Sequence, residues 1–391
     1  MTTRIKDLGS IITGNTPKTS ESANYGSDDI CFVKPSDFAD GDVTYIKSSE
    51  FYISEFARKK SRILPPESVL VTCIGTIGKV AINQVECAFN QQINAIIPNR
   101  QRCITTYLAY AIQAKQVTMQ EMANAPVVPI LNKTQFSDIE INVPPITQQQ
   151  HIAAVLDKIS YLISLRKQQL DKLDELVKAR FVEMFGEPKM NPMGWPIVNI
   201  TTVMDGKVSN GFFAKRDEYV DDGNVAVLGV AYVVNRMYSQ CTNLPRTNAT
   251  EKDIQKYTVK YGDMLFCRSS LVAEGIGKAS IVPKDIPQGT LFECHVIRFP
   301  LNLSKCVPEF MQVLTTTDFF REQIISQSKT ATMTTIGQDG ILNSHIILPP
   351  MEIQKKYYDF IVQINKCKLT IREGLDKLET MKKTLMQQYF G

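Results

Sequence analysis

The sequence predicts an α+β protein that contains two copies of one module, each a β-rich domain followed by a helix of about forty residues. Three observations support this: a strict repeat near the end of each half, a heptad pattern within that repeat, and short β-branched runs elsewhere. The predicted boundaries are residues 1–143 and 188–348 for the two domains, and 144–187 and 349–391 for the two helices.

The repeat is strict in its helical part. PPITQQQ at 144–150 returns as PPMEIQK at 349–355, and LDKL at 170–173 returns at 375–378 with the same offset of 205 residues. Phe185 and Gly186 match Phe390 and Gly391 at that offset too. The domains match more loosely. There we align Leu8, Ile11 and Gly14 with Ile200, Val203 and Gly206, residues 66–70 with 261–265, and Ile77-Gly78-Lys79 with Ile276-Gly277-Lys278. Geometry is therefore conserved between the helices, while the domains vary their surface.

Each helix carries an apolar seam whose members alternate four and three residues apart, the spacing of a coiled coil. The first seam is Ile152, Leu156, Ile159, Ile163, Arg166, Leu170, Leu173 and Val177, with Arg166 as its polar exception. The second is Tyr357, Ile361, Ile364, Lys368, Ile371, Leu375, Leu378, Lys382, Leu385 and Tyr389, with two lysines as exceptions.

Such a helix spans roughly 60 Å, too long to bury its seam on its own small domain. The second helix must then run back along the first, which predicts an antiparallel coiled-coil spacer and a pseudo-two-fold arrangement of the two domains. The alternative is that each helix packs on its own domain as ordinary core, and the sustained heptad argues against it.

Residues flanking the helices predict where they start and stop. Thr147 with Gln150 fits a capping box, which satisfies free N–H groups at a helix start. Glu352 takes that position in the second copy and is a poor cap, so we expect a less sharply defined start there. Gly186, followed by Glu187-Pro188, should end the first helix.

Short β-branched and apolar runs predict strands in both domains. They lie at 68–72, 80–82 and 93–97 in the first domain, and at 264–267, 279–282 and 295–299 in the second. Helical stretches follow near 104–123 and 307–327.

Composition sets limits on function. Forty-four Lys and Arg residues against 40 Asp and Glu leave a net charge of +4, and the pI of 8.4 is below that of many dedicated nucleic-acid domains. Any nucleic-acid binding must therefore come from local patches or be shared with a partner. Nine scattered cysteines and the lack of an apolar leader favour a reduced, cytoplasmic protein, and no apolar stretch is long enough to span a membrane.

No catalytic or metal motif emerges. Gly78-Lys79 and Gly277-Lys278 suggest phosphate loops, but neither has the upstream Gly or the following Ser or Thr, so we interpret both as hairpin turns. His151, His295 and His345 are isolated, and nothing pairs a nucleophile with a base. We therefore expect no catalytic site and no cofactor in this chain.

With the repeat and the helices established, the chain resembles the specificity subunits of type I restriction–modification systems over nearly its whole length. The segments that carry the resemblance are PPITQQQHIAAVLDKI, LDKLDEL, FVEMFGEPKMNPMGWP, LGSIITGNTP and VLVTCIGTIGKVAI. Their order and duplication are more specific than any one of them.

The resemblance implies that each domain is a target-recognition domain for one half of a bipartite, asymmetric site on double-stranded DNA. It implies that the helices dock two modification subunits, which bind S-adenosylmethionine and methylate adenine. Restriction subunits, which use ATP and Mg²⁺, would complete the complex. Two half-sites about one helical turn, roughly 34 Å, apart would suit two domains on a rigid spacer.

Basic and amide side chains in loops are the candidates for DNA contact, because cations bind phosphates and amides or arginine bind base edges. In the first domain they are Asn15, Thr16, Lys18, Arg58, Lys59, Lys60, Arg62, Thr76, Lys79, Gln91 and Gln92. In the second they are Lys207, Asn210, Lys215, Arg216, Arg268, Ser269 and Lys278. Arg268 is the strongest candidate for a base contact. For the Arg58–Arg62 cluster a plain solvated surface remains the alternative, and for Gln91 and Gln92 local backbone bonding does.

Two other functions remain open on the sequence alone. One is a coiled-coil scaffold or adaptor that gathers partners without reading DNA. The other is a specificity subunit of a related restriction–modification type.

Overall fold

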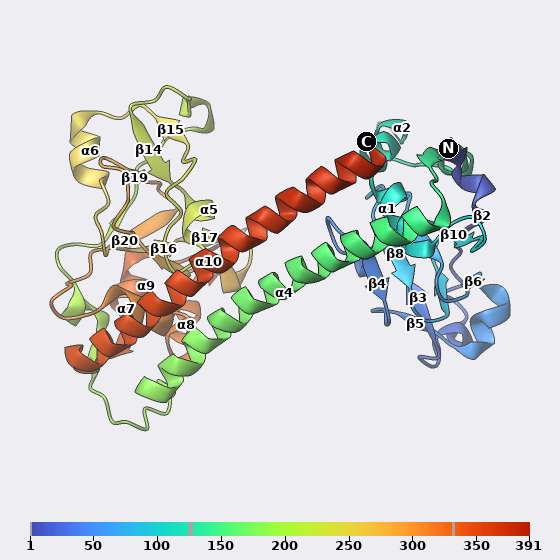
Figure 1. Cartoon of the computed structure of the whole chain (residues 1–391). Helices are drawn as coiled ribbons and strands as arrows, with labels where there is room; N and C mark the ends of the chain where they lie inside the picture. Colours follow the sequence, from blue (N-terminus) through green and yellow to red (C-terminus); the bar gives the residue numbers. More distant parts are fainter. Residues whose placement is uncertain (1, 124–127, 331–332) are drawn as a thin grey trace. The chain divides into compact units, whose positions relative to one another are not determined.

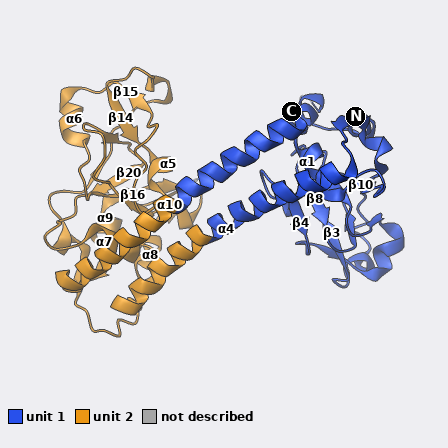
Figure 2. Cartoon of the chain, viewed as in Figure 1, with its two compact units in different colours: residues 1–168, 371–391 blue, residues 169–370 orange. Residues whose placement is uncertain are grey.

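The computed structural model describes residues 2–123, 128–330 and 333–391, which form two compact units (Figures 1 and 2). Unit 1 comprises residues 1–168 and 371–391, and unit 2 comprises residues 169–370. The unit boundaries fall inside the two long helices, so each helix contributes one end to each unit. No helix among the described residues is long and apolar enough to cross a membrane. The four-part division of the chain stays a prediction, as does the pseudo-two-fold arrangement.

Unit 1 is built on a five-stranded sheet of order β2-β10-β7-β8-β4 and a four-stranded sheet of order β5-β3-β9-β6. A two-stranded pair, β1-β11, joins its first and last strands. The strands are β1 (Thr2–Arg4), β2 (Gly9–Thr13), β3 (Ile30–Val33), β4 (Thr44–Ile46), β5 (Tyr52–Ile53), β6 (Ile63–Leu64), β7 (Val69–Thr72), β8 (Val80–Asn83), β9 (Cys87–Phe89), β10 (Ile93–Pro98) and β11 (Glu140–Asn142). The helices are α1 (Thr105–Gln113), α2 (Gln116–Met122), α3 (Lys133–Asp138) and the start of α4 (Ile146–Phe185).

Unit 2 repeats this plan with additions. Its four-stranded sheet, β13-β20-β16-β18, matches β2-β10-β7-β8, and its pair β12-β23 matches β1-β11. Two three-stranded sheets, β15-β14-β19 and β17-β22-β21, complete it. The strands are β12 (Ile197–Asn199), β13 (Ser209–Asn210), β14 (Val225–Leu228), β15 (Arg246–Thr247), β16 (Met264–Cys267), β17 (Ser269–Ser270), β18 (Ala279–Ile281), β19 (Leu291–Phe292), β20 (Val296–Phe299), β21 (Lys329–Thr330), β22 (Thr334–Thr335) and β23 (His345–Ile347). The helices are α5 (Val230–Val233), α6 (Glu251–Tyr257), α7 (Pro308–Leu314), α8 (Asp318–Ser326), α9 (Gln338–Leu342) and the start of α10 (Met351–Phe390).

The predicted α+β class is confirmed, and each predicted strand is present to within a residue or two. The two predicted helical stretches are each broken into two helices, α1 with α2 and α7 with α8. Both long helices are 40 residues long, and α4 ends at Phe185 as predicted, where Gly186 adopts a left-handed φ of 76°. The indole Nε1 of Trp195 then donates to the carbonyl of Phe185 (2.9 Å), which satisfies a free acceptor at the helix end.

The predicted caps are wrong. Both helices start one residue after Pro-Pro, so Thr147 and Glu352 already lie inside the first turn, and the two starts are equally well defined. Gln149 and Gln354, both fully buried, anchor them instead. The side-chain oxygen of Gln149 accepts from Ile104 N (2.9 Å), and that of Gln354 accepts from Val307 N (2.9 Å). Each amide nitrogen donates to the first proline carbonyl, at 2.8 and 2.7 Å. The glutamine of the shared PPxxxQ pattern, Gln149 or Gln354, therefore hydrogen-bonds the start of each helix to its own domain.

The seams have two roles, which corrects the idea that they pack only on another helix. In unit 1, Ile152 and Leu156 enter the domain core, and Phe390 from the end of α10 joins them, 5.4 Å from the ring of Tyr107. In unit 2 the core takes Val177 of α4 together with Tyr357, Ile361 and Ile364 of α10. Ile159 and Ile163 are also buried. Of the remaining members, Arg166 is exposed, and those that are half-buried are Leu170, Leu173, Ile371, Leu375, Leu378, Leu385 and Tyr389.

The helices lie side by side and antiparallel within each unit. In unit 2 the hydroxyl of Tyr357 donates to the carbonyl of Val177 (3.0 Å), and Lys368 pairs with Asp174 (2.5 Å). In unit 1, Lys167 pairs with Glu379 (3.2 Å). The two polar exceptions of the second seam are thus ion-paired, since Lys382 also meets Asp42 (2.6 Å).

Candidate nucleic-acid interface

In unit 1, strand register brings the predicted contact loops to one end of the five-stranded sheet. Strand β2 ends at Thr13, opposite Asn94 near the start of β10, and β7 ends at Thr72, opposite Ile93. The loops at 14–18, 73–79 and 90–92 therefore leave the sheet at the same end. Antiparallel pairing, invisible in any one segment, accounts for this convergence.

Side-chain hydrogen bonds tie these loops to the basic cluster. Asn15 donates to the carbonyl of Lys60 (2.8 Å) and accepts from the N–H of Arg62 (2.8 Å). The hydroxyl of Thr16 donates to the side-chain oxygen of Gln91 (2.6 Å). The guanidinium of Arg62 donates to the carbonyl of Thr13. Asn15 and Gln91 thus position the loop surface with part of their hydrogen-bonding capacity.

Two of the four cations in the basic cluster are neutralised by ion pairs. Arg58 pairs with Glu55 and with Glu86 (2.7 Å), and Lys60 pairs with Glu21 (2.7 Å). These contacts also hold the pKa of the Glu21 carboxyl below its ordinary value, chiefly through the hydrogen bond from Lys60.

Further along this end, Lys79 is mostly buried and pairs with Asp40 (2.6 Å). Gln92 accepts from the side-chain amide of Asn90 (2.9 Å). Lys18, Lys59 and Arg62 are exposed and form no ion pair with any described residue, and Thr76 is exposed on the hairpin. These four exposed side chains are therefore accessible to an outside ligand.

Unit 2 presents the equivalent end of its four-stranded sheet. Strand β16 ends at Cys267, opposite Val296, and β18 begins at Ala279. Arg268 and Ser269 directly follow the end of β16, and Lys278 directly precedes the start of β18. Arg268 is half-buried and its Nη1 donates to the carbonyl of Cys294 (3.3 Å), a long bond that leaves most of the guanidinium unused.

The predicted alignment of Gly14 with Gly206 is wrong, and its correction changes where the predicted contact Lys207 lies relative to the sheet end. Gly14 corresponds to Gly211, not Gly206, because each leaves the sheet over the turn before β10 or β20. A Cβ would lie 2.1 Å from the carbonyl oxygen of Asn90 at Gly14, and 2.2 Å from that of Glu293 at Gly211, so only glycine fits.

The corrected alignment sorts the remaining basic residues of unit 2. Lys215 and Arg216 lie in the counterpart of the 14–18 loop, and both are exposed. Asn210 lies at the end of β13, beside them. Lys207 lies beyond the other end of β13, near Pro300, away from Arg268.

Sequence reasoning missed several residues at this end. The Nδ1 of His295 lies 3.3 Å from the hydroxyl of Ser269, and Ser269 and Ser270 pair with Thr335 and Thr334 of β22. His295 precedes β20 as Gln92 precedes β10, so the repeat itself could have identified it. Arg321 of α8 has no such signal in the sequence, since α8 reaches this region only through tertiary packing.

Two buried carboxyl groups of unit 2 lie elsewhere. Burial raises the pKa of Asp263 to about 6, against a hydrogen bond from the N–H of Lys260 and the charge of Arg298. Burial also raises the pKa of Glu309, which accepts from the hydroxyl of Tyr238 (2.7 Å). Among the described residues no group of three or more His, Cys, Asp or Glu side chains could hold a metal ion. The sheet end therefore offers hydrogen bonds and positive charge to a ligand.

Comparison with known proteins identifies relatives of one kind. A family model described as the type I restriction modification DNA specificity domain matches residues 1–175. The MjaIX specificity subunit of Methanocaldococcus jannaschii is 25% identical over 386 residues, covering 92% of this chain and 85% of that protein. The EcoKI specificity subunit of Escherichia coli is 18% identical over 422 residues, covering 99% and 87%.

Solved structures share the fold. The type I restriction–modification S subunit from M. genitalium covers 100% of this chain and 96% of its own, with a TM-score of 0.57 at 10% identity. A structure described as showing complex assembly and conformational transition of the type I system covers 100% and 97%, with a TM-score of 0.56 at 15% identity. These names do not favour a scaffold without a recognition role.

Proposed function

We propose that this chain is a type I restriction–modification DNA specificity subunit and that each of its two units reads one half of a bipartite, asymmetric target on double-stranded DNA. The observation that carries this proposal is the polar end of the main sheet in each unit, where loops from distant segments converge. Unit 1 offers Lys18, Lys59 and Arg62 there, and unit 2 offers Arg268 and His295. Because the two sets differ, the two half-sites should differ.

The exposed faces of the long helices support a docking role. Tyr161, Leu162, Leu176 and Val182 on α4 are large apolar side chains exposed by between 37 and 63%. Aromatic and aliphatic side chains of this kind are enriched in the cores of protein interfaces. We propose that these faces bind two modification subunits, which carry S-adenosylmethionine, and that restriction subunits with ATP and Mg²⁺ join the complex. In this proposal the chain itself is non-catalytic and works in the cytoplasm.

The proposal is tested by co-expressing the full chain with its cognate modification subunit and mapping methylated bases across the host genome. We expect adenine methylation at a new motif with two specified halves and unspecified bases between them. An active modification subunit that adds no new methylation would contradict DNA reading and leave the scaffold alternative standing.

Arg268→Ala tests the base contact within the same assay. Arginine that grips guanine contributes about 1–3 kcal/mol of discrimination, so the variant should relax or lose one base of the unit 2 half-site. Lys207→Ala is the matched control, because Lys207 lies at the other end of the sheet and should leave the motif unchanged. Full methylation of the original motif by Arg268→Ala would exclude Arg268 as a reader.

A further inference from the structure

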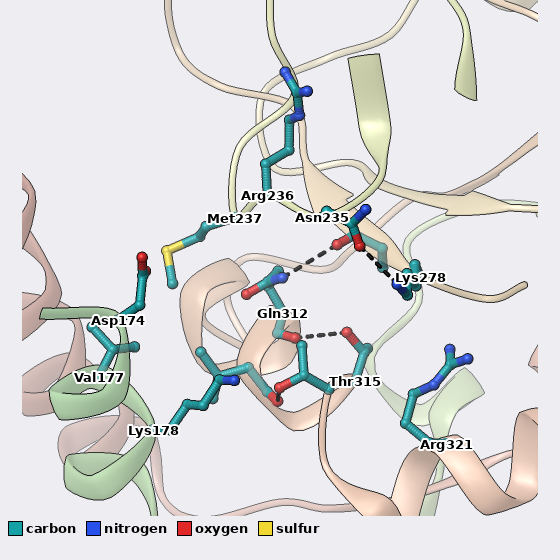
Figure 3. A pocket seen from close by; sticks show the side chains of 13 residues that line it. Asp174, Val177, Lys178, Asn235, Arg236, Met237, Lys278, Gln312, Thr315 and Arg321 are labelled. Atoms are coloured by element: carbon teal, nitrogen blue, oxygen red, sulfur yellow. Dashed lines mark hydrogen bonds between the residues drawn. The ribbon is translucent and has the colours of Figure 1, made fainter. Parts of the chain in front are cut away.

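Unit 2 contains a cavity of about 450 Å³ that borders the candidate interface. Its walls come from the last turns of α4, residues 235–237, the start of β18, and helices α7 and α8 (Figure 3). Lys178, Lys278 and Arg321 reach it from three different elements. The one carboxylate in the lining, Asp174, already pairs with Lys368 (2.5 Å).

Among the residues that the structure describes, these three cations have no ion-pair partner. The Nζ of Lys278 donates to the neutral side-chain oxygen of Asn235 (2.7 Å). Arg321 donates through Nη2 to the carbonyl of Glu274 (3.1 Å), while its Nη1 is buried without a hydrogen-bond partner. Neither they nor Lys178 form an ion pair with any described residue. Burial lowers the pKa of Arg321, with only the nearby Glu274 and Cys267 opposing it.

A fourth cation in the lining does not contribute. The guanidinium of Arg236 bonds to the carbonyls of Val234 (3.3 Å) and Ala231 (3.2 Å) and to Gln240 (2.5 Å). It extends away from the centre of the cavity in Figure 3.

Unit 1 provides an internal comparison. Tyr45 pairs with Ile82 as Tyr238 pairs with Ile281, so Asp42 takes the place of Asn235. In unit 1 the hairpin lysine, Lys79, meets Asp40 at 2.6 Å, and Asp42 itself meets Lys382 at 2.6 Å. The corresponding region is thus neutralised within unit 1, whereas unit 2 has the lysine without the equivalent carboxylates.

We propose that this cavity binds a phosphate group of the DNA backbone through Lys278, Arg321 and Lys178, an inference that rests on the proposed function. Lysine and arginine are the usual phosphate ligands, and an anion would relieve the repulsion between three unpaired cations. None of the described residues that line the cavity is aromatic, so they offer no surface for stacking a base. Lys278 also belongs to the sheet end, which makes the phosphate site continuous with the proposed reading surface.

The salt dependence of DNA binding tests the proposal. The full chain is titrated onto a labelled duplex of mixed sequence at several salt concentrations, since phosphate contacts do not depend on sequence. Each lost phosphate contact should reduce the slope of log affinity against log salt by about 0.9. We expect that reduction for Lys278→Gln with Arg321→Gln, and a wild-type slope for the control variant Lys305→Gln, whose lysine is exposed in unit 2 and donates to the carbonyl of Thr202 (3.2 Å).

A wild-type slope for the double variant would overturn the site and leave DNA reading intact. If neither the wild type nor any variant bound the duplex, the proposed function itself would be contradicted, and with it the assignment of the phosphate to DNA. If the double variant fails to fold, Lys278→Gln alone serves, because glutamine keeps a donor for Asn235.

Inorganic phosphate separates the backbone from a small phosphorylated ligand. If the site serves DNA, phosphate should compete weakly with the duplex and raise the unfolding temperature of the wild type more than that of the double variant. Strong stabilisation of the wild type by phosphate, together with an unchanged slope in the double variant, would assign the cavity to a free ligand and overturn the backbone assignment.

Discussion

Replacing Gln354 with Leu should detach the start of α10 from its domain. Gln354 is fully buried, accepts from the N–H of Val307 (2.9 Å) and donates to the carbonyl of Pro349 (2.7 Å). Leucine has a similar volume and can make neither bond. The N–H of Val307, itself in a residue only 7% exposed, would then lack an acceptor.

The magnitude follows from these two bonds. A buried N–H without a partner costs about 1–3 kcal/mol, and the second hydrogen bond contributes about 1 kcal/mol. Burying leucine in place of the amide offsets this by about 1 kcal/mol. We therefore expect Gln354→Leu to lower the free energy of unfolding of unit 2 by about 2 kcal/mol.

Urea denaturation followed by the fluorescence of Trp195 measures this directly, because Trp195 is the single tryptophan of the chain and lies in unit 2. Gln363→Leu, an exposed position on the same helix, is the control and should change stability by less than about 0.5 kcal/mol. Gln149→Leu removes the equivalent two bonds in unit 1 and a third to the carbonyl of Arg102 (3.1 Å), so it should lower the stability of unit 1 by at least as much, measured by urea denaturation followed by circular dichroism. If Gln354→Leu matched the Gln363→Leu control, the glutamine anchor would be refuted.

Three further predictions concern unit 2. The pKa of Asp263 is raised to about 6, so the folded state gains from protonation at low pH and loses that stability as pH rises from about 4 to about 6. Asp263→Asn should then raise the free energy of unfolding by up to about 3 kcal/mol at pH 7 and leave it unchanged near pH 4. Urea unfolding at both pH values measures this, and an equal effect of the substitution at pH 7 and pH 4 would show that burial does not raise this pKa. Lys368→Met should change the free energy of unfolding by less than about 1 kcal/mol, whereas Asp174→Ala should lower it by more because the buried ammonium of Lys368 is left without its partner. A larger drop in urea midpoint for Lys368→Met than for Asp174→Ala would contradict this. Phe185→Ala removes a fully buried ring from the aromatic cluster and should cost about 3–5 kcal/mol, and a loss under 1 kcal/mol would mean that the helix end is not held there.

Local patterns were sufficient for six of the strands and for the two long helices. The strands at 69–72, 80–83 and 93–98 follow from short β-branched runs bounded by turn residues, and the long helices follow from a heptad bounded by Pro-Pro and Gly. The same patterns misplaced the helix caps. A capping box is a short local motif, whereas Gln149 reaches Ile104, which is 45 residues earlier in the chain.

The candidate site was found only in outline. Loops around Asn15, Gln91 and Arg268 were identified from their polar residues, and sheet register does bring the loops of each unit together. The sequence could not predict which basic side chains of these loops are ion-paired. Arg58 pairs with Glu86 and Lys79 pairs with Asp40, and both carboxylates come from other segments that only the fold brings close.

By itself the sequence determined the duplicated module, its α+β class, its long helices and the family that it resembles, since each of these depends on residue spacing or on order along the chain. Only the tertiary structure decided which cations are paired. Ion pairs depend on atoms brought within about 4 Å by folding, and the sequence does not say which carboxylates arrive. That is why Lys79 and Lys278, alike in their local Ile-Gly-Lys context, end with different partners: a carboxylate in one unit and a neutral amide in the other.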